Sequence, residues 1–231
     1  MGDNDSKSGN SADGHRARLR SRLLVQGGND LHDHELVEYL LALAIPRRDT
    51  KELAKQLIAQ YGSLAGLFAA DANNLKAQAG MGETSVAAIK IVQAAAVRML
   101  SEPVREQPIL ASWQALLDYL RADMAHLTIE RVRVLYLNSK NMLIRDEVAS
   151  DGSIDQAAIY TREVIKRALD LGAVAVILVH NHPSGDSSPS RQDIAMTREI
   201  ADAGKRLAIA VHDHIIIGKD GFSSMRSAGL I

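Results

Sequence analysis

The first hundred residues carry hydrophobic side chains at intervals of three and four, which is the spacing of one face of an α-helix. The pattern is clearest in residues 33–44, where Asp33 precedes an apolar stripe as a candidate N-cap. The same spacing predicts further helices at residues 15–25, 50–61 and 64–70, and two more within 75–99. An all-α domain is therefore expected over residues 15–100.

Two segments without this periodicity bound the helical domain. Residues 1–14 (MGDNDSKSGNSADG) are rich in glycine, serine, aspartate and asparagine, which predicts a disordered tail. Residues 101–108 (SEPVREQP) hold two prolines among mixed charges and are expected to form a linker. A second domain is then expected over residues 109–231.

The pattern of the second half is different. Residues 131–137 (RVRVLYL) alternate polar and apolar side chains, as a half-buried strand does, and residues 173–179 (AVAVILV) form the short apolar run of a buried strand. The other predicted elements are strands at 142–149 and 207–217, and helices at 113–125, 160–171 and from 190 onward. This order predicts an α/β domain of ordinary size.

Composition excludes several classes of protein. The chain of 231 residues is 46% hydrophobic and 24% charged, as in a soluble globular protein, and its net charge of −1 gives no overall basic field for nucleic acid. The absence of cysteine excludes disulfides, thiol catalysis and thiolate metal ligands. No apolar stretch approaches the roughly twenty residues that cross a bilayer, so we expect no membrane association and a cytoplasmic location.

Two histidines follow the apolar run directly, in the sequence HNHPSGDSSPSRQD at residues 180–193. Side chains two residues apart on a strand point to the same face, so His180 and His182 can converge on one ion at the end of the strand. Neutral imidazole suits zinc, and a carboxylate can add a third ligand while one position stays open for water. An open position is typical of a catalytic zinc site.

Ser190 and Asp193 allow a second interpretation. Together they form a Ser-x-x-Asp capping box before the helical segment 194–207, so both could simply begin a helix. A cap explains these two residues but not the paired histidines, and an aspartate that begins a helix can also bind a metal. The adjacent letters His-Asn-His are not the HNH nuclease motif, whose members are spread over a longer segment.

The spacing of His180, His182, Ser190 and Asp193 matches the JAMM signature of MPN-type zinc metalloproteases, and the string HNHPSGD-x-x-PS-x-x-D resembles the RadC family of bacterial proteins. The resemblance covers nearly all of residues 15–231. It implies a mixed sheet flanked by helices and a Zn²⁺ ion held by His180, His182 and Asp193, with the Ser190 hydroxyl donating to the oxyanion or steadying the water. It also implies a metallopeptidase or isopeptidase that acts on a peptide or protein substrate not identified by the sequence.

A zinc hydrolase needs a base that takes the proton from water. Related JAMM proteins place this glutamate where the first helix of the domain passes into its first strand, and Glu130 lies there. Glu147, in the second predicted strand, is the alternative. We expect Glu130 to be the base.

A second His-x-His, formed by His212 and His214, lies in the last predicted strand. It could orient a metal ligand, form a rival ligand pair, or be a polar part of the strand. Because metal-binding histidines need orienting partners, we expect an orienting or structural role.

Residues 75–99 resemble the helix-hairpin-helix element of DNA-handling proteins. The turn Gly80–Gly82 permits a tight connection, and free amides at the start of the second helix can hold a phosphate. Lys76 and Lys90 are the nearest cations, so at most a weak, non-specific DNA contact is expected; an ordinary α-hairpin is the alternative.

The leading hypothesis is therefore a zinc-dependent metallopeptidase with a helical N-terminal module that can contact DNA. One alternative is a non-catalytic DNA-associated accessory protein with a structural zinc. The other is a metal-dependent nuclease, although that chemistry usually uses Mg²⁺ on clustered carboxylates.

Overall fold

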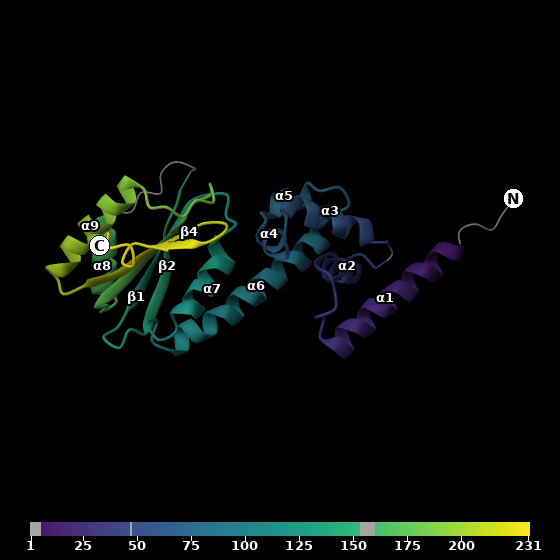
Figure 1. Ribbon diagram of the computed structural model, residues 1–231, viewed down its shortest axis with the longest axis horizontal. Helices are drawn as coiled ribbons and strands as arrows, with labels where there is room; N and C mark the ends of the chain where they lie inside the picture. The colour runs from purple at the N-terminus through teal and green to yellow at the C-terminus, as the bar shows by residue number, and fades with distance from the viewer. Residues whose placement is uncertain (1–5, 47, 153–159) are drawn as a thin grey trace. The chain divides into compact units, whose positions relative to one another are not determined.

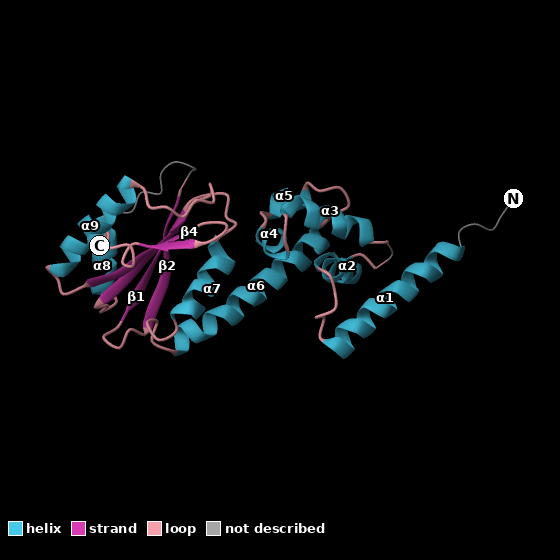
Figure 2. Ribbon diagram, in the orientation of Figure 1, coloured by secondary structure: helices cyan, strands magenta, loops and turns pink. Residues whose placement is uncertain are grey.

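The computed structural model describes residues 6–46, 48–152 and 160–231 (Figure 1). The chain divides into two compact units, Met1–Ala94 and Ala95–Ile231, with the boundary inside a long helix. Described residues of the first unit form helices and turns, whereas all five strands lie in the second (Figure 2). The predicted fold class, a helical region followed by an α/β domain, is confirmed.

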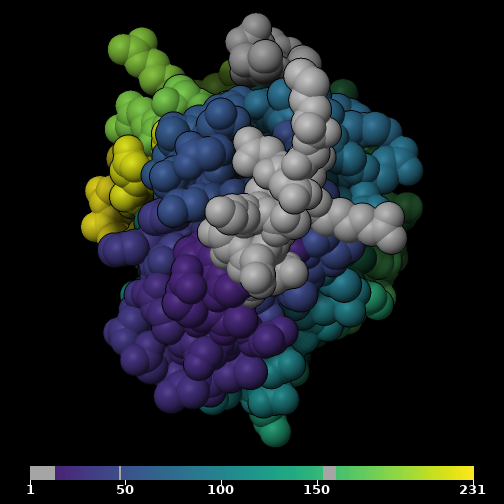
Figure 3. Space-filling view, turned by 90° about the vertical axis from the view of Figure 1, so that its right-hand side faces the viewer, coloured from purple at the N-terminus to yellow at the C-terminus, as the bar shows by residue number. Residues whose placement is uncertain are grey.

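The helical unit is built from helices, most of which bring their apolar stripes together. They are α1 (Ser6–Gln26), α2 (Asp33–Ala44), α3 (Lys51–Tyr61), α4 (Leu64–Ala69), α5 (Ala72–Lys76) and the first half of α6 (Glu83–Glu106). The predicted stripes form one core, in which Leu41, Leu57 and Ile89 are buried. In the space-filling view, purple residues of the first helices lie beside blue residues of the later ones (Figure 3).

Helix α1 begins earlier than expected. Residues 6–14 were predicted to belong to a disordered tail, but the helix already starts at Ser6; residues 1–5 of that tail lie outside the described residues. Extending an existing helix costs less than nucleating a new one, so the helix at 15–25 can continue into a segment of weak propensity. Gly27 and Gly28, both with positive φ, follow its C-terminal end.

The predicted linker is also helical over most of its length. Helix α6 continues through residues 101–106 although Pro103 lies inside it. A proline inside a helix removes one backbone hydrogen bond. The next residue, Val104, is fully buried in the core of the second unit, and this burial offsets the cost.

Within the described residues, one helix, α6, is long and apolar enough to cross a membrane by length and composition alone. This differs from the expectation that no such segment exists. A single helix of this kind is weak evidence for a membrane protein. Both halves of α6 also contribute to packed cores, since Ile89 and Val104 are fully buried.

The second unit holds a mixed sheet of five strands. Its elements are α7 (Trp113–Met124), β1 (Arg131–Leu137), β2 (Leu143–Asp151), α8 (Thr161–Asp170), β3 (Ala175–Asn181), α9 (Arg191–Lys205), β4 (Ala210–Ile217) and β5 (Phe222–Ser224). The strand order is β2-β1-β3-β4-β5, and only the β3–β4 pair is parallel. The short β5 had not been predicted, because three residues are too few to show a period.

Both faces of the sheet are covered, so every residue of β3 is buried. Ile177 and Val179 contribute to the core that also contains α7, whereas Val176 and Leu178 contribute to the core that contains α8 and α9. Alternate residues of the strand therefore belong to different cores. The even-numbered residues of β3 point toward α9. His180 and His182 are also even-numbered, so they are expected on this side of the sheet.

Candidate metal centre

The end of β3 presents both histidines on the side of α9. His180 continues the even-numbered positions of the strand and is almost completely buried. His182 follows the strand, and its backbone N–H donates to the Ile217 carbonyl at 2.9 Å, which holds it beside the end of β4. The two Nε2 atoms lie only 2.8 Å apart. The predicted convergence of the two imidazoles is therefore present in the fold.

Asp193 reaches the same point from the first turn of α9. Its Oδ1 lies 3.5 Å from Nε2 of His180, and its Oδ2 lies 3.6 Å from Nε2 of His182. One candidate ligand atom from each of the three residues lies within 4.8 Å of the others. The structure thus brings together the three residues that were predicted to hold a metal.

Ser190 and Asp193 also form the predicted capping box. The Ser190 N–H donates to Asp193 Oδ2 at 2.7 Å, and the Asp193 N–H donates to Ser190 Oγ at 3.1 Å. The two interpretations of this pair therefore hold together: the cap fixes the carboxylate, and the fixed carboxylate faces the histidines. Ser190 is an exposed residue, and its Oγ, which accepts in this bond, keeps its own hydrogen for a further partner.

A chain of hydrogen bonds behind His180 decides which of its nitrogens carries a proton. It begins at the backbone carbonyl of Asp193, which can only accept, so Thr197 Oγ1 donates to it at 2.6 Å. The Thr197 oxygen then accepts from Nδ1–H of His214, also at 2.6 Å. His214 Nε2 in turn accepts from Nδ1–H of His180 at 2.8 Å. Nε2 of neutral His180 is therefore unprotonated.

The same argument applies to His182 and shows that the site fits a cation. Nδ1 of His182 lies 2.7 Å from the Asp186 carbonyl, so it is the donor, and Nε2 of the neutral ring has no proton. When both rings are neutral, two unprotonated nitrogens therefore face each other at 2.8 Å, beside a carboxylate. Lone pairs this close repel one another unless a positive charge lies near both. The residues present fit a divalent metal ion.

Burial keeps His180 and His214 neutral, and the Asp193 carboxylate draws positive charge into the cluster. Burial lowers the pKa of His180 to about 4 and that of His214 to about 3. The Asp193 carboxylate, 3.6 Å from Nε2 of His182, raises the pKa of His182 against the effect of burial. Burial would raise the pKa of Asp193, but interactions with His182, His180 and Ser190 outweigh it and hold that pKa well below its usual range. The site therefore attracts positive charge.

Glu130 lies immediately before β1 on the same face as the histidines. Glu130 is an even-numbered residue like Val134 and Tyr136, which belong to the core under α8 and α9. Since alternate residues of a strand point to the same face, Glu130 lies on that side of the sheet. The Gly152 N–H donates to the Glu130 carbonyl at 3.0 Å and continues the pairing of β1 with β2. Burial raises the pKa of Glu130, and the charges of His182 and Asp193 also act on it. Glu130 therefore borders the cluster.

Glu147 occupies a different place. It lies on β2 opposite Val134, which itself pairs with Leu178, so it is displaced along the sheet from His180. Both of its carboxylate oxygens accept hydrogen bonds from Arg167 of α8, and this pairing lowers the pKa of Glu147. Of the two glutamates, Glu130 is therefore the one beside the histidine cluster.

The second His-x-His does not form a ligand pair. His214 contacts His180 from behind, whereas His212 Nε2 lies 2.8 Å from Asn141 Oδ1 in the turn between β1 and β2.

Thr197 was not among the residues predicted from the sequence. Its position four residues after Asp193, on the same face of a helix, was the signal that could have found it.

The predicted hairpin has a tight turn, but both of its lysines already have hydrogen-bond partners within the protein. Gly80 has a φ of 91°, which favours glycine. Lys90 Nζ donates to the carbonyls of Phe68 and Ala70 at 3.0 and 2.9 Å, and Lys76 Nζ lies 2.7 Å from Glu83 Oε1. Both expected cations are thus engaged within the protein, and the DNA contact stays a prediction.

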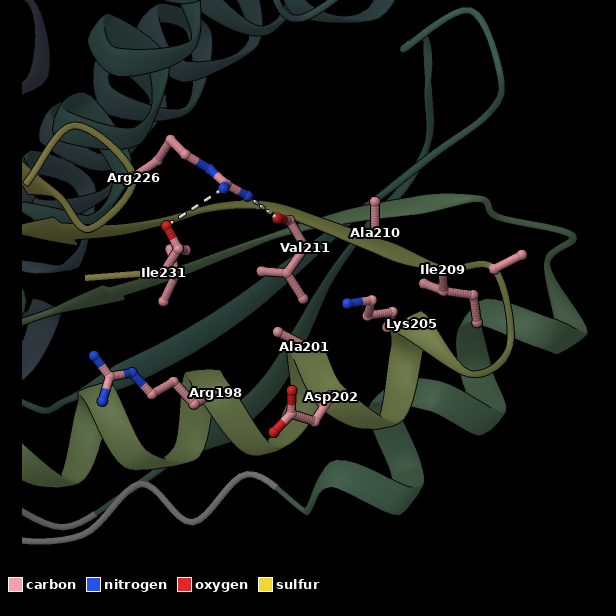
Figure 4. A pocket seen from close by; sticks show the side chains of 10 residues that line it. Arg198, Ala201, Asp202, Lys205, Ile209, Ala210, Val211, Arg226 and Ile231 are labelled. Atoms are coloured by element: carbon pink, nitrogen blue, oxygen red, sulfur yellow. Dashed lines mark hydrogen bonds between the residues drawn. The ribbon is translucent and has the colours of Figure 1, made fainter. Parts of the chain in front are cut away.

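A separate cavity of about 700 Å³ lies between the later turns of α9 and the start of β4 (Figure 4). Arg226, on its rim, donates to the carbonyls of Val211 and Ile231. Arg198 donates to the carbonyl of Leu230. These two arginines hold the last residues of the chain, and none of the residues that line the cavity belongs to the histidine cluster.

Comparison with known proteins agrees with this geometry. Residues 110–230 match the family described as "RadC-like JAB domain", and residues 14–87 match "UPF0758 N-terminal". A UPF0758 protein of Rhodobacter capsulatus is 48% identical over 213 residues, which cover 92% of this chain and the whole of that relative. Fold and cluster together define a JAB-domain protein. The chain belongs to the RadC-like UPF0758 family.

Proposed function

We propose that this protein is a zinc-dependent metallopeptidase or isopeptidase. The observation that carries the proposal is the pair of Nε2 atoms of His180 and His182, which lie 2.8 Å apart beside the Asp193 carboxylate. Two imidazoles and one carboxylate are a ligand set typical of catalytic zinc. Within the described residues the cluster offers three such ligands, and this leaves room for a fourth that is not protein.

The neighbouring residues have the properties that hydrolysis needs. Zinc in such a site supplies an acidified water and polarises a carbonyl group. Glu130 would accept a proton there and return it to the leaving amine, and its raised pKa suits both transfers. The free hydrogen of Ser190 Oγ would be donated to the developing oxyanion, an interaction worth about 3 kcal/mol in the transition state.

Metal content is the first test. Protein purified without chelator should contain about one zinc per chain by elemental analysis. The double substitution His180→Ala/His182→Ala should remove it while far-ultraviolet circular dichroism stays unchanged. A folded wild type that contains no zinc and takes up none when it is added would overturn the proposal.

Hydrolysis is the second test, with an internally quenched peptide library and lysine-ε-linked peptides as probes. Cleavage should require zinc and should fall about 100-fold or more in Glu130→Gln, because a general base contributes about 10²–10⁴-fold. Glu147→Gln is the matched control and should retain activity. Absence of peptide cleavage, together with metal-dependent DNA cleavage that is lost in His180→Ala, would favour the nuclease alternative.

A further inference from the structure

Asn181 is the residue between the two histidines, and its side chain contacts the backbone on both sides of Glu130. We infer that Asn181 is a positioning residue that fixes Glu130 relative to the metal ligands. This inference rests on the proposed function, because it assigns a role in the same hydrolysis. Asn181 lies between His180 and His182 along the strand, so its side chain points to the other face of the sheet and not toward the metal ligands.

The side chain of Asn181 makes two hydrogen bonds to one short segment. The Arg131 N–H donates to Asn181 Oδ1 at 2.9 Å, and Asn181 Nδ2 donates to the Ile129 carbonyl at 3.0 Å. These groups belong to the two peptide bonds that flank the Cα of Glu130. Asn181 is 1% exposed, so water does not compete for either bond.

The position of Asn181 in the sheet explains why a side chain is needed here. The ladder between β1 and β3 ends at the pair Val132 and His180. On the other side of β3, the Asn181 main chain pairs with Ile217 of β4. Main-chain pairing between β1 and β3 therefore does not extend to Glu130. The Asn181 carboxamide supplies the hydrogen bonds that join β3 to this segment. The segment that carries the base is thus tied to the strand that carries the ligands.

A carboxamide suits both bonds because it carries an acceptor and a donor on separate atoms of one plane. The Arg131 N–H can only donate and the Ile129 carbonyl can only accept, so the first needs the oxygen of Asn181 and the second needs its NH₂ group. Aspartate would keep the bond to Arg131 but would place a second acceptor against the Ile129 carbonyl. Asn181→Asp therefore removes one bond selectively, and Asn181→Ala removes both.

The chain offers a matched control at the other end of β1. Asn138 Oδ1 accepts from the N–H groups of Lys140 and Met142, at 2.8 and 3.1 Å, in the turn after the strand. Asn138→Ala therefore also removes two hydrogen bonds between an asparagine and the backbone. A general loss of stability should affect both variants, whereas a loss of Glu130 positioning should appear only in Asn181→Ala.

The experiment compares zinc content, amide exchange and cleavage of the quenched peptide library in these variants. Asn181→Ala should keep its zinc, and the Arg131 amide should exchange at least about tenfold faster by NMR because its acceptor is lost. Cleavage should fall about 10–100-fold, as for other residues that orient a site. Asn138→Ala should show neither effect. Asn181→Asp should lose cleavage while the Arg131 amide stays protected.

A double-mutant cycle tests whether Asn181 acts through Glu130. In a Glu130→Gln background, Asn181→Ala should cause no further loss of cleavage, since residues that act as a unit are not additive. An additive loss, or loss of zinc from Asn181→Ala, would overturn the inference. A wild type that binds zinc but cleaves no probe would refute the proposed function. In that case, an unchanged exchange rate of the Arg131 amide in Asn181→Ala would separately refute the role of the Asn181 side chain in holding the segment around Glu130.

Discussion

Single residues around His180 determine where protons lie, and Thr197 is the first of them. Its hydroxyl donates to the Asp193 carbonyl and accepts from His214, which in turn accepts from His180. Thr197→Val keeps the shape but leaves the His214 N–H without an acceptor. We expect zinc affinity to weaken about 10–100-fold, the usual effect of losing an orienting partner. Competition with a chromophoric chelator measures this, and Thr197→Ser, which keeps the hydroxyl, should bind as the wild type does.

Asp193 has two roles that substitution can separate. Asp193→Ala removes both a metal ligand and half of the capping box, so zinc should be lost and stability should fall by about 1 kcal/mol. Asp193→Asn keeps an oxygen for the Ser190 N–H but removes the negative charge. It should therefore regain most of the stability in urea unfolding while zinc affinity stays low. Full zinc occupancy in Asp193→Ala would contradict the assignment of Asp193 as a ligand.

At the scale of elements, the loop after β3 is held against the end of β4 by a close approach. A Cβ on Gly218 would lie 2.3 Å from the Gly185 carbonyl, a distance that only glycine permits. Gly218→Ala should therefore displace the loop that carries His182 and lower zinc affinity about tenfold, because ligand geometry is lost. Gly221→Ala is the matched control, since its Cβ would meet no atom within 4 Å. Equal zinc affinity in both variants would show that the loop position does not matter.

The stability of the whole protein should depend on pH through its buried histidines. Burial lowers the pKa of His180 to about 4 and that of His214 to about 3, from an ordinary 6.5. Between these values and 6.5 the unfolded chain binds more protons than the folded one, so stability rises with pH in this window. Acidifying metal-free protein below pH 6.5 should thus lower its free energy of unfolding, by up to about 1.4 kcal/mol per pH unit for each histidine.

Urea unfolding of metal-free protein near pH 7 and near pH 5 measures this dependence. The variant His214→Gln cannot take up the proton, so its loss of stability between the two pH values should be smaller than that of the wild type. The comparison cancels the contribution of other groups, including His126 and His212, whose pKa values are also lowered by burial. An identical loss in both proteins would show that His214 is not held neutral by the fold.

Much of the fold could be predicted because it follows local patterns. The period of residues 33–44 predicted helix α2 with its bounds, although its N-cap is His32 and not Asp33. The alternation in residues 131–137 predicted β1, but the strand is buried after its first residue and not half-buried, because both faces of the sheet are covered. The helical course of residues 101–106 could not be predicted, because Pro103 argues against a helix locally and the burial of Val104 becomes visible only in the packed core. Strand β5 depends on pairing with β4 and has no pattern of its own.

Local spacing is enough to place His180 and His182 on one face at the end of a buried strand, and to make Asp193 begin the next helix. These features depend on spacing of a few residues, which strand and helix geometry fix locally. In contrast, the position of Glu130 beside the cluster and the pairing of Glu147 with Arg167 are set by tertiary packing. The same packing lets Thr197 and His214 set the proton on His180, and it brings Asn181 into contact with the segment around Glu130. These contacts join strands and helices far apart in the chain, so they depend on register and packing that no local pattern records.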